Sequence, residues 1–191
     1  MTLINTEGMA LIGPGSEWFW TALSGVVLAL TFLAIYRQLR LQRSANAFEQ
    51  LNGLVDAWES ERMLRQRLAA YLALRDGGAL SEIPAGAAFY IADFWEKVGG
   101  LTRAGHIETS LIKESLGLAC QSWWWILTPI VQEERAGSDD PTAYIHFEWT
   151  AAKMATMGPT RSFDRATIDR VLEERIASTQ ASLHDLEEMR R

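Results

Sequence analysis

The feature that most constrains this chain is an uncharged run of 19 residues, positions 18–36, near its N-terminus. All of them except Thr21, Ser24 and Thr31 are apolar or aromatic. As a helix rising about 1.5 Å per residue, the run would extend about 28 Å, close to the ~30 Å hydrocarbon core of a bilayer. Because a backbone within lipid must satisfy its own hydrogen bonds, the run predicts a transmembrane helix at 18–36, after a short extracytoplasmic segment at 1–17.

Residues flanking the predicted span indicate its anchoring and its orientation. Aromatic rings, which favour the headgroup layer, stand at its two ends: Trp18, Trp20 and Tyr36. Lys and Arg are absent before the span, whereas three arginines follow it: Arg37, Arg40 and Arg43. The positive-inside rule then predicts a single-pass protein of the bacterial inner membrane, with its N-terminus outside and residues 37–191 in the cytoplasm. A cleaved signal peptide, the alternative, would need a basic n-region and a shorter apolar core.

Small residues recur on one face of the predicted span. Ala22, Gly25 and Ala29 are three and four residues apart, so they lie along the same side of a helix. Small side chains at this spacing let two membrane helices approach closely and associate. The face therefore predicts self-association, although Gly and Ala are also common in membrane helices that stay monomeric.

The rest of the chain has the apolar spacing of helices and lacks the alternating pattern of strands. The membrane helix is expected to continue to about residue 75 with a kink near Gly53, because only that glycine interrupts it before Gly77 and Gly78. Further helices are expected at 85–103, 108–116, 118–135, 140–157 and 164–191. The predicted fold is all-α: an N-terminal transmembrane helix that continues into a cytoplasmic multi-helix bundle.

Two of these segments leave alternatives open. The last helix carries a narrow, mostly apolar seam, which would cover one edge of the bundle or pair with another helix. Its residues are Ile168, Leu172, Ile176, Thr179, Leu183 and Leu186. Residues 116–132 are uncharged, so they form either a second membrane segment or a buried core helix. The run is short for a span and contains Pro129, which favours the buried helix.

Three consecutive tryptophans, Trp123, Trp124 and Trp125, stand within this second apolar run. Successive residues of a helix point about 100° apart, so the three indoles cannot share one face. At least one should reach a boundary, which would be the edge of the core, a partner subunit or the membrane surface. Because Trp is enriched at interface hot spots, these residues are candidates for assembly, and the alternative is simple packing over the side of the bundle.

Composition and motifs argue against several kinds of chemistry. The 191 residues include 18 basic and 24 acidic ones, a net charge of −6, which is unfavourable for a nucleic-acid partner. The single cysteine, Cys120, excludes an intramolecular disulfide and a cysteine zinc site. We find no nucleotide-binding or zinc motif, so neither a cofactor nor a catalytic residue is predicted. A degenerate helical nuclease built around Arg103 and His106 remains the enzymatic alternative.

Several short motifs stand out along the chain: residues 35–39 after the aromatic-rich span, residues 94–96 with Val98, Gly99 and Leu101, residues 105–107, and Trp124 and Trp125 with Pro129. Together they resemble a bacterial family known only as a domain of unknown function, over about residues 16–150. Because these motifs are aromatic and structural, the resemblance implies no functional residue. The layout is also similar to small membrane accessory proteins of RNA-targeting CRISPR systems, which have one span and a helical cytoplasmic domain and can form pores.

These observations predict a non-enzymatic, self-associating membrane module: a scaffold, a sensor or a membrane-perturbing effector of antiphage defence. The expected partners are membrane lipid and further copies of the chain. A membrane-tethered adaptor, which recruits a soluble protein, is the alternative within the binding class. The sequence does not choose among these roles.

Overall fold

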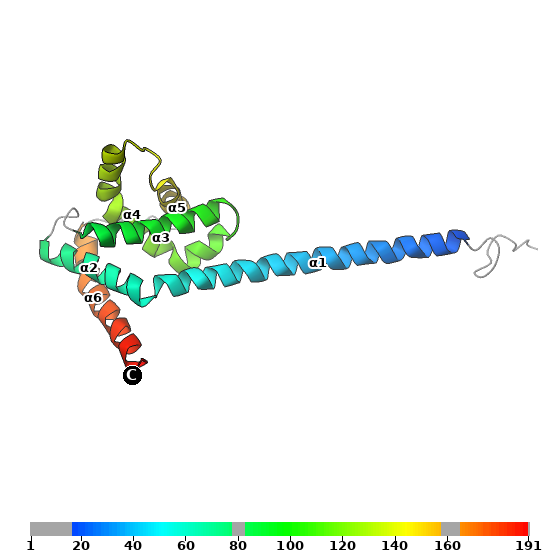
Figure 1. The fold of residues 1–191 in the computed structure, drawn as a ribbon, viewed down its shortest axis with the longest axis horizontal. Helices are drawn as coiled ribbons and strands as arrows, with labels where there is room; N and C mark the ends of the chain where they lie inside the picture. The colour runs from blue at the N-terminus through cyan, green and yellow to red at the C-terminus, as the bar shows by residue number, and fades with distance from the viewer. Residues whose placement is uncertain (1–16, 78–82, 158–164, 191) are drawn as a thin grey trace, which may run out of the picture. The chain divides into compact units, whose positions relative to one another are not determined.

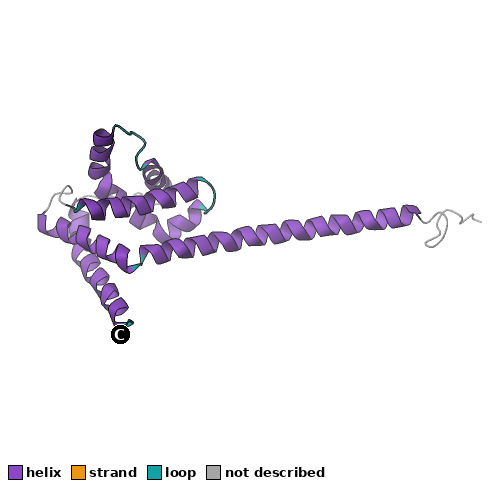
Figure 2. Cartoon of the chain, in the orientation of Figure 1, coloured by secondary structure: helices purple, strands orange, loops and turns teal. Residues whose placement is uncertain are grey.

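The computed structural model describes residues 17–77, 83–157 and 165–190 (Figure 1). These residues form helices joined by turns, and no strand occurs among them (Figure 2). The helices are α1 Glu17–Trp58, α2 Glu61–Gly77, α3 Ala85–Arg103, α4 Thr109–Ser138, α5 Ile145–Thr156 and α6 Arg165–Glu188. The prediction of an all-α fold is therefore confirmed. By its internal packing the chain divides into two units, residues 1–46 and 47–191.

Helix α1 continues beyond the apolar run, as predicted, but it does not reach residue 75, and the predicted kink near Gly53 is also wrong. The helix remains regular through Gly53 and ends at Trp58. The break falls at residues 59 and 60, where the Ser60 hydroxyl oxygen accepts a hydrogen bond from the Met63 amide at 3.3 Å. Serine in this position caps the first turn of the next helix, so a capping residue rather than the glycine sets the boundary.

Helix α4 replaces the two helices that were expected at 108–116 and 118–135. It runs without interruption through Gly117 and Pro129. A Cβ added at Gly117 would lie 3.4 Å from the Met154 sulfur of α5. The glycine therefore lies at the contact of α4 with α5 and does not end a helix.

Helix α5 begins at Ile145, five residues later than the expected start at Asp140. The Asp140 side chain accepts hydrogen bonds from the amide and the hydroxyl of Thr142 at 2.8 and 2.6 Å, which stabilise a turn. Tyr144 follows with a positive φ of 58°, so the backbone between them is not helical. Asp140 and Pro141 thus form a turn rather than a helix start.

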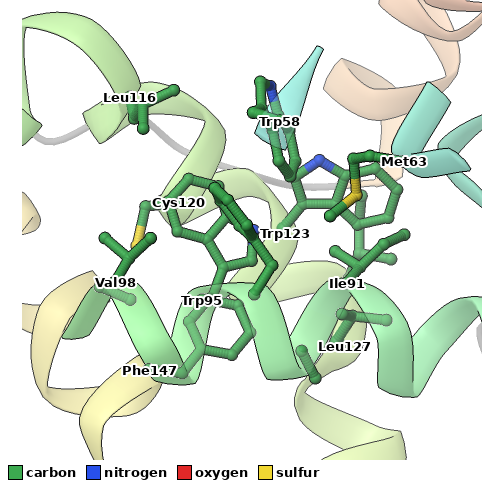
Figure 3. Packing of buried hydrophobic residues seen from close by; sticks show 14 of the residues in the cluster. Trp58, Met63, Ile91, Trp95, Val98, Leu116, Cys120, Trp123, Leu127 and Phe147 are labelled. Atoms are coloured by element: carbon green, nitrogen blue, oxygen red, sulfur yellow. The ribbon is translucent and has the colours of Figure 1, made fainter. Parts of the chain in front are cut away.

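The core of the second unit is rich in aromatic residues. Figure 3 shows Trp58, Trp95, Trp123 and Phe147 packed together, and their ring centroids are 5.0 Å apart for Trp58 and Trp95 and 6.0 Å apart for Trp95 and Phe147. These side chains come from the end of α1 and from α3, α4 and α5. Large rings buried in this way supply much of the hydrophobic stabilisation of a small domain.

Helix α6 packs along α2. Leu172 and Ile176 of its predicted seam are buried, whereas the side chain of Ile168 lies outside the described residues. Within the second unit the seam therefore covers an edge of the bundle, which was one of the two predicted alternatives. In α4, residues such as Cys120, Trp123 and Leu127 are buried, so the segment 116–132 is a core helix and not a second span.

Candidate functional site

The apolar segment of α1, Glu17–Leu39, is the one helix among the described residues that is long and apolar enough to cross a membrane. None of its apolar stretch is buried within the chain. Phe32, for example, is 70% exposed. The Thr21 and Thr31 hydroxyls donate to carbonyl oxygens one turn back, at 2.8 Å each, so these two polar groups are satisfied within the helix.

The predicted anchor residues lie at the two ends of this segment. Trp18, Trp20 and Tyr36 are exposed, and so is Arg37. Arg40 and Arg43 belong to α1, but their side chains lie outside the described residues. The exposed rings and the Arg37 side chain are accessible at the ends of the apolar segment, and their role as membrane anchors stays a prediction.

Ala22, Gly25 and Ala29 are all exposed on one side of α1. A Cβ added at Gly25 would meet no other atom within 4 Å. The face is thus open to a second helix, and self-association through it stays a prediction.

The three tryptophans of α4 have different environments. Trp123 is buried against Trp58 and Tyr71, whose ring lies 5.1 Å away, so it belongs to the core of its own chain. Trp124 is half-buried, with its ring edge-on to Phe147 at 5.0 Å, and Trp125 is also half-buried. The expected divergence of the indoles is therefore observed. Trp124 and Trp125 retain surface that an assembly could use.

The motif at residues 94–101 joins α3 to α5. The Glu96 carboxylate accepts hydrogen bonds from the amides of His146 and Phe147 at 3.0 and 2.8 Å, and so it satisfies the free N–H groups of the first turn of α5. A Cβ at Gly99 would lie 2.3 Å from the His146 carbonyl oxygen, so only glycine permits this approach. Trp95 between them is fully buried. The motif therefore has a structural role.

The cysteine and the three histidines have different environments. Cys120 is buried, and burial raises the pKa of its thiol, which disfavours the nucleophilic thiolate. His106 is exposed in the turn after α3, His146 lies in α5, and the ring of His184 faces Glu188 of α6 at 3.4 Å. Within the described residues, no three His, Cys, Asp or Glu side chains form a group that could hold a metal ion.

A polar cavity of about 170 Å³ lies within the second unit, between α2, α4 and α6. The guanidinium carbon of Arg67 lies 4.5 Å from the centroid of the Trp58 ring. Arg67 Nη1 donates to the Trp58 carbonyl oxygen and to Glu59 Oε1, both at 3.4 Å. Tyr71 also lines the cavity, and burial raises the pKa of its phenol above its usual value.

This cavity and its arginines, Arg67 and Arg175, were not predicted from the sequence. A signal was present in α2, where Leu64, Arg67, Tyr71 and Leu74 follow a spacing of three, four and three residues. This face is the inner one, because Leu64 and Leu74 are fully buried and Arg67 is only 9% exposed. An arginine in an apolar stripe is unusual, since Arg is rarely buried without a partner.

Comparison with known families identifies the chain. Residues 20–154 match the family described as a domain of unknown function, DUF4760. The chain belongs to this family. The DUF4760 match begins in the apolar segment of α1 and ends in α5, so α6 lies outside it. No curated protein and no solved structure matches the chain. The predicted likeness to a family of unknown function is confirmed, whereas the likeness to CRISPR accessory proteins is not shown.

Proposed function

We propose that this chain is a single-span protein of the bacterial inner membrane, with residues 37–191 in the cytoplasm. The observation that carries the proposal is the apolar helix Glu17–Leu39, none of whose apolar stretch is buried within the chain. A continuous exposed apolar surface of this size is unfavourable in water and is typical of a membrane or partner contact. Its aromatic ends and the arginines that follow support a bilayer as that partner.

The same segment supports self-association of the anchored chain. The exposed face of Ala22, Gly25 and Ala29 would let two spans approach closely. Trp124 and Trp125 provide half-buried indole surface on the second unit. We therefore assign the chain a non-enzymatic role in assembly at the membrane.

Among assembly roles, the hydroxyl groups of the span favour a scaffold or sensor over a water-filled pore. The Thr21 and Thr31 hydroxyl protons are directed to carbonyl oxygens of their own helix, so they offer no donors to a lumen. The span carries no charged side chain between residues 18 and 36. A membrane-perturbing effector that forms a water-filled pore would need a more polar face on the span, lining that pore.

Mass photometry of the full-length protein in nanodiscs tests the assembly, and we expect one defined oligomer. Gly25→Ile should shift that oligomer toward monomers, because the added side chain separates the two helices. The matched control is Val27→Ile, since residue 27 is two positions away and faces the opposite side of the helix. The monomer itself accommodates the change at Gly25, where no atom lies within 4 Å of an added Cβ.

Two results would contradict the proposal. Release of the protein from membranes at alkaline pH would exclude the transmembrane anchor. If the wild-type protein is a monomer and co-purifies with a soluble protein, self-association is excluded and the adaptor role is favoured.

A further inference from the structure

The cavity between α2, α4 and α6 contains a buried cation with unused hydrogen-bonding capacity. Arg67 is 9% exposed, and its Nε has no hydrogen-bond partner among the described residues. Its two Nη1 contacts, at 3.4 Å, are long for hydrogen bonds from a charged donor. Because a buried guanidinium is unfavourable without a full set of acceptors, Arg67 is suited to a further acceptor in the cavity.

Arg175 of α6 is a second arginine in the lining of this cavity. It is exposed and forms no ion pair with any residue in the described part of the chain. Glu59 is the one carboxylate of the lining, and its side chain is 52% exposed. Two arginines against one glutamate give the lining a net charge of +1, which complements a singly charged anion.

One hydroxyl group of the lining, that of Ser178, supplies a further donor. Ser122 and Thr179 donate to carbonyl oxygens of their own helices, at 3.0 and 2.7 Å. The Ser178 hydroxyl lies three residues from Arg175 on α6, and within the described residues it has no partner. An oxyanion in the cavity would accept from this hydroxyl as well as from the guanidinium groups.

An open, largely apolar groove of about 490 Å³ adjoins the cavity. The two share lining residues, among them Trp58, Ala119 and Arg175. The groove adds the side chains of Val55, Leu116 and Leu118, and Leu118 is 39% exposed. A cationic cavity that continues into an apolar groove is complementary to a molecule with an anionic head and an apolar chain.

We propose that this site binds an anionic amphiphile, with a singly charged oxyanion head between Arg67 and Arg175 and its acyl chain in the groove. The head is a carboxylate or a phosphodiester, since both present acceptor oxygens with one negative charge. The inference goes beyond the membrane anchor and does not rest on it, because the lining residues all belong to the second unit.

Native mass spectrometry of the full-length protein in a nonionic detergent tests this site. Dodecanoate supplies the carboxylate head, and dihexanoyl-phosphatidylglycerol supplies the phosphodiester. Dodecyltrimethylammonium has the same chain as dodecanoate with the opposite charge, and acetate has the head without the chain. We expect one bound dodecanoate or phosphatidylglycerol and much weaker binding of the two control compounds.

Substitution of the arginines then locates the ligand. Arg175→Gln should weaken binding about tenfold or more, because a charged donor to the head is lost. Arg67→Gln should weaken binding to a similar extent. If that variant fails to fold, the result for Arg175→Gln, at an exposed position, is the test. Arg75→Gln, which changes an exposed arginine outside both linings, should leave binding unchanged.

Each result has a defined meaning. Binding of only one of the two heads supports the proposal and identifies the class of amphiphile. The proposal is overturned by the absence of binding with both probes, by unchanged binding in Arg175→Gln, or by equal binding of dodecyltrimethylammonium. Acetate bound as tightly as dodecanoate would also overturn it, because the groove would then contribute nothing.

Discussion

At the scale of single residues, Gly99 is the described glycine whose added Cβ would meet the closest atoms. A Cβ there would lie 2.3 Å from the His146 carbonyl oxygen and 2.6 Å from the Thr150 hydroxyl oxygen, so α3 and α5 would have to separate. We expect Gly99→Ala to lower the free energy of unfolding by about 1–3 kcal/mol, the usual effect of overpacking. Chemical denaturation measures this change.

Gly86→Ala is the matched control for this prediction. It lies in the same helix, α3, and an added Cβ there would meet no atom within 4 Å. Because Ala has a higher helix propensity than Gly, we expect the free energy of unfolding to stay the same or to rise by up to about 1 kcal/mol. Equal effects at both positions would mean that the close approach at Gly99 does not limit stability.

Glu96 acts on the same interface through hydrogen bonds. Its carboxylate accepts hydrogen bonds from the amides of His146 and Phe147 at the start of α5. A negative charge at this end of a helix also interacts favourably with the helix dipole. We expect Glu96→Ala to cost about 1–2 kcal/mol of unfolding free energy, as for the loss of an N-cap. Glu114→Ala, at an exposed position of α4, should cost much less in the same denaturation experiment. A loss no greater than that of Glu114→Ala would show that the cap is dispensable.

At the scale of elements, the attachment of α6 depends on its buried seam. Ile176 is 3% exposed in this seam, and α6 packs along α2. We expect Ile176→Ala to lower the unfolding free energy by about 2 kcal/mol or more, because truncation leaves a cavity. Amide hydrogen exchange should become faster in α6 than in α3 and α5, since local unfolding begins where fewer contacts hold an element. Gln180→Ala, on the exposed side of α6, is the control.

The helices themselves were largely predictable from the sequence, and their boundaries were less so. Apolar spacing located α3 at residues 85–103, which is where it lies. The errors arose at Gly53, Gly117 and the Asp140-Pro141 pair, because such residues mark a helix end in one context and lie inside a helix or in a turn in another. Gly117 lies inside α4, where it faces Met154 from a distant part of the chain.

The candidate sites also differ in how far they could be predicted from the sequence. The apolar segment and its aromatic ends could be read from residues that are contiguous in sequence. The cavity around Arg67 could not, because its lining comes from four helices, and Arg175 lies more than 100 positions from Arg67. The inward position of Arg67 was detectable in principle from the 3-4-3 stripe of α2. Its pairing with Arg175 depends on how α6 packs along α2.

At the scale of the whole molecule, the orientation of the span decides where the second unit acts. Cys120 is the single cysteine, and its burial, which also raises the pKa of the thiol, should leave the native protein unlabelled by a membrane-impermeant maleimide. Thr6→Cys then adds a thiol before the span, and Ala104→Cys adds an exposed one after α3. With the N-terminus outside, the reagent should label Thr6→Cys in cells whose inner membrane is intact and should label Ala104→Cys only after lysis. The reverse pattern would place the second unit outside the inner membrane, and its arginine cavity could then bind only ligands found there. Labelling of both variants in intact cells would exclude a transmembrane arrangement that separates the two thiols.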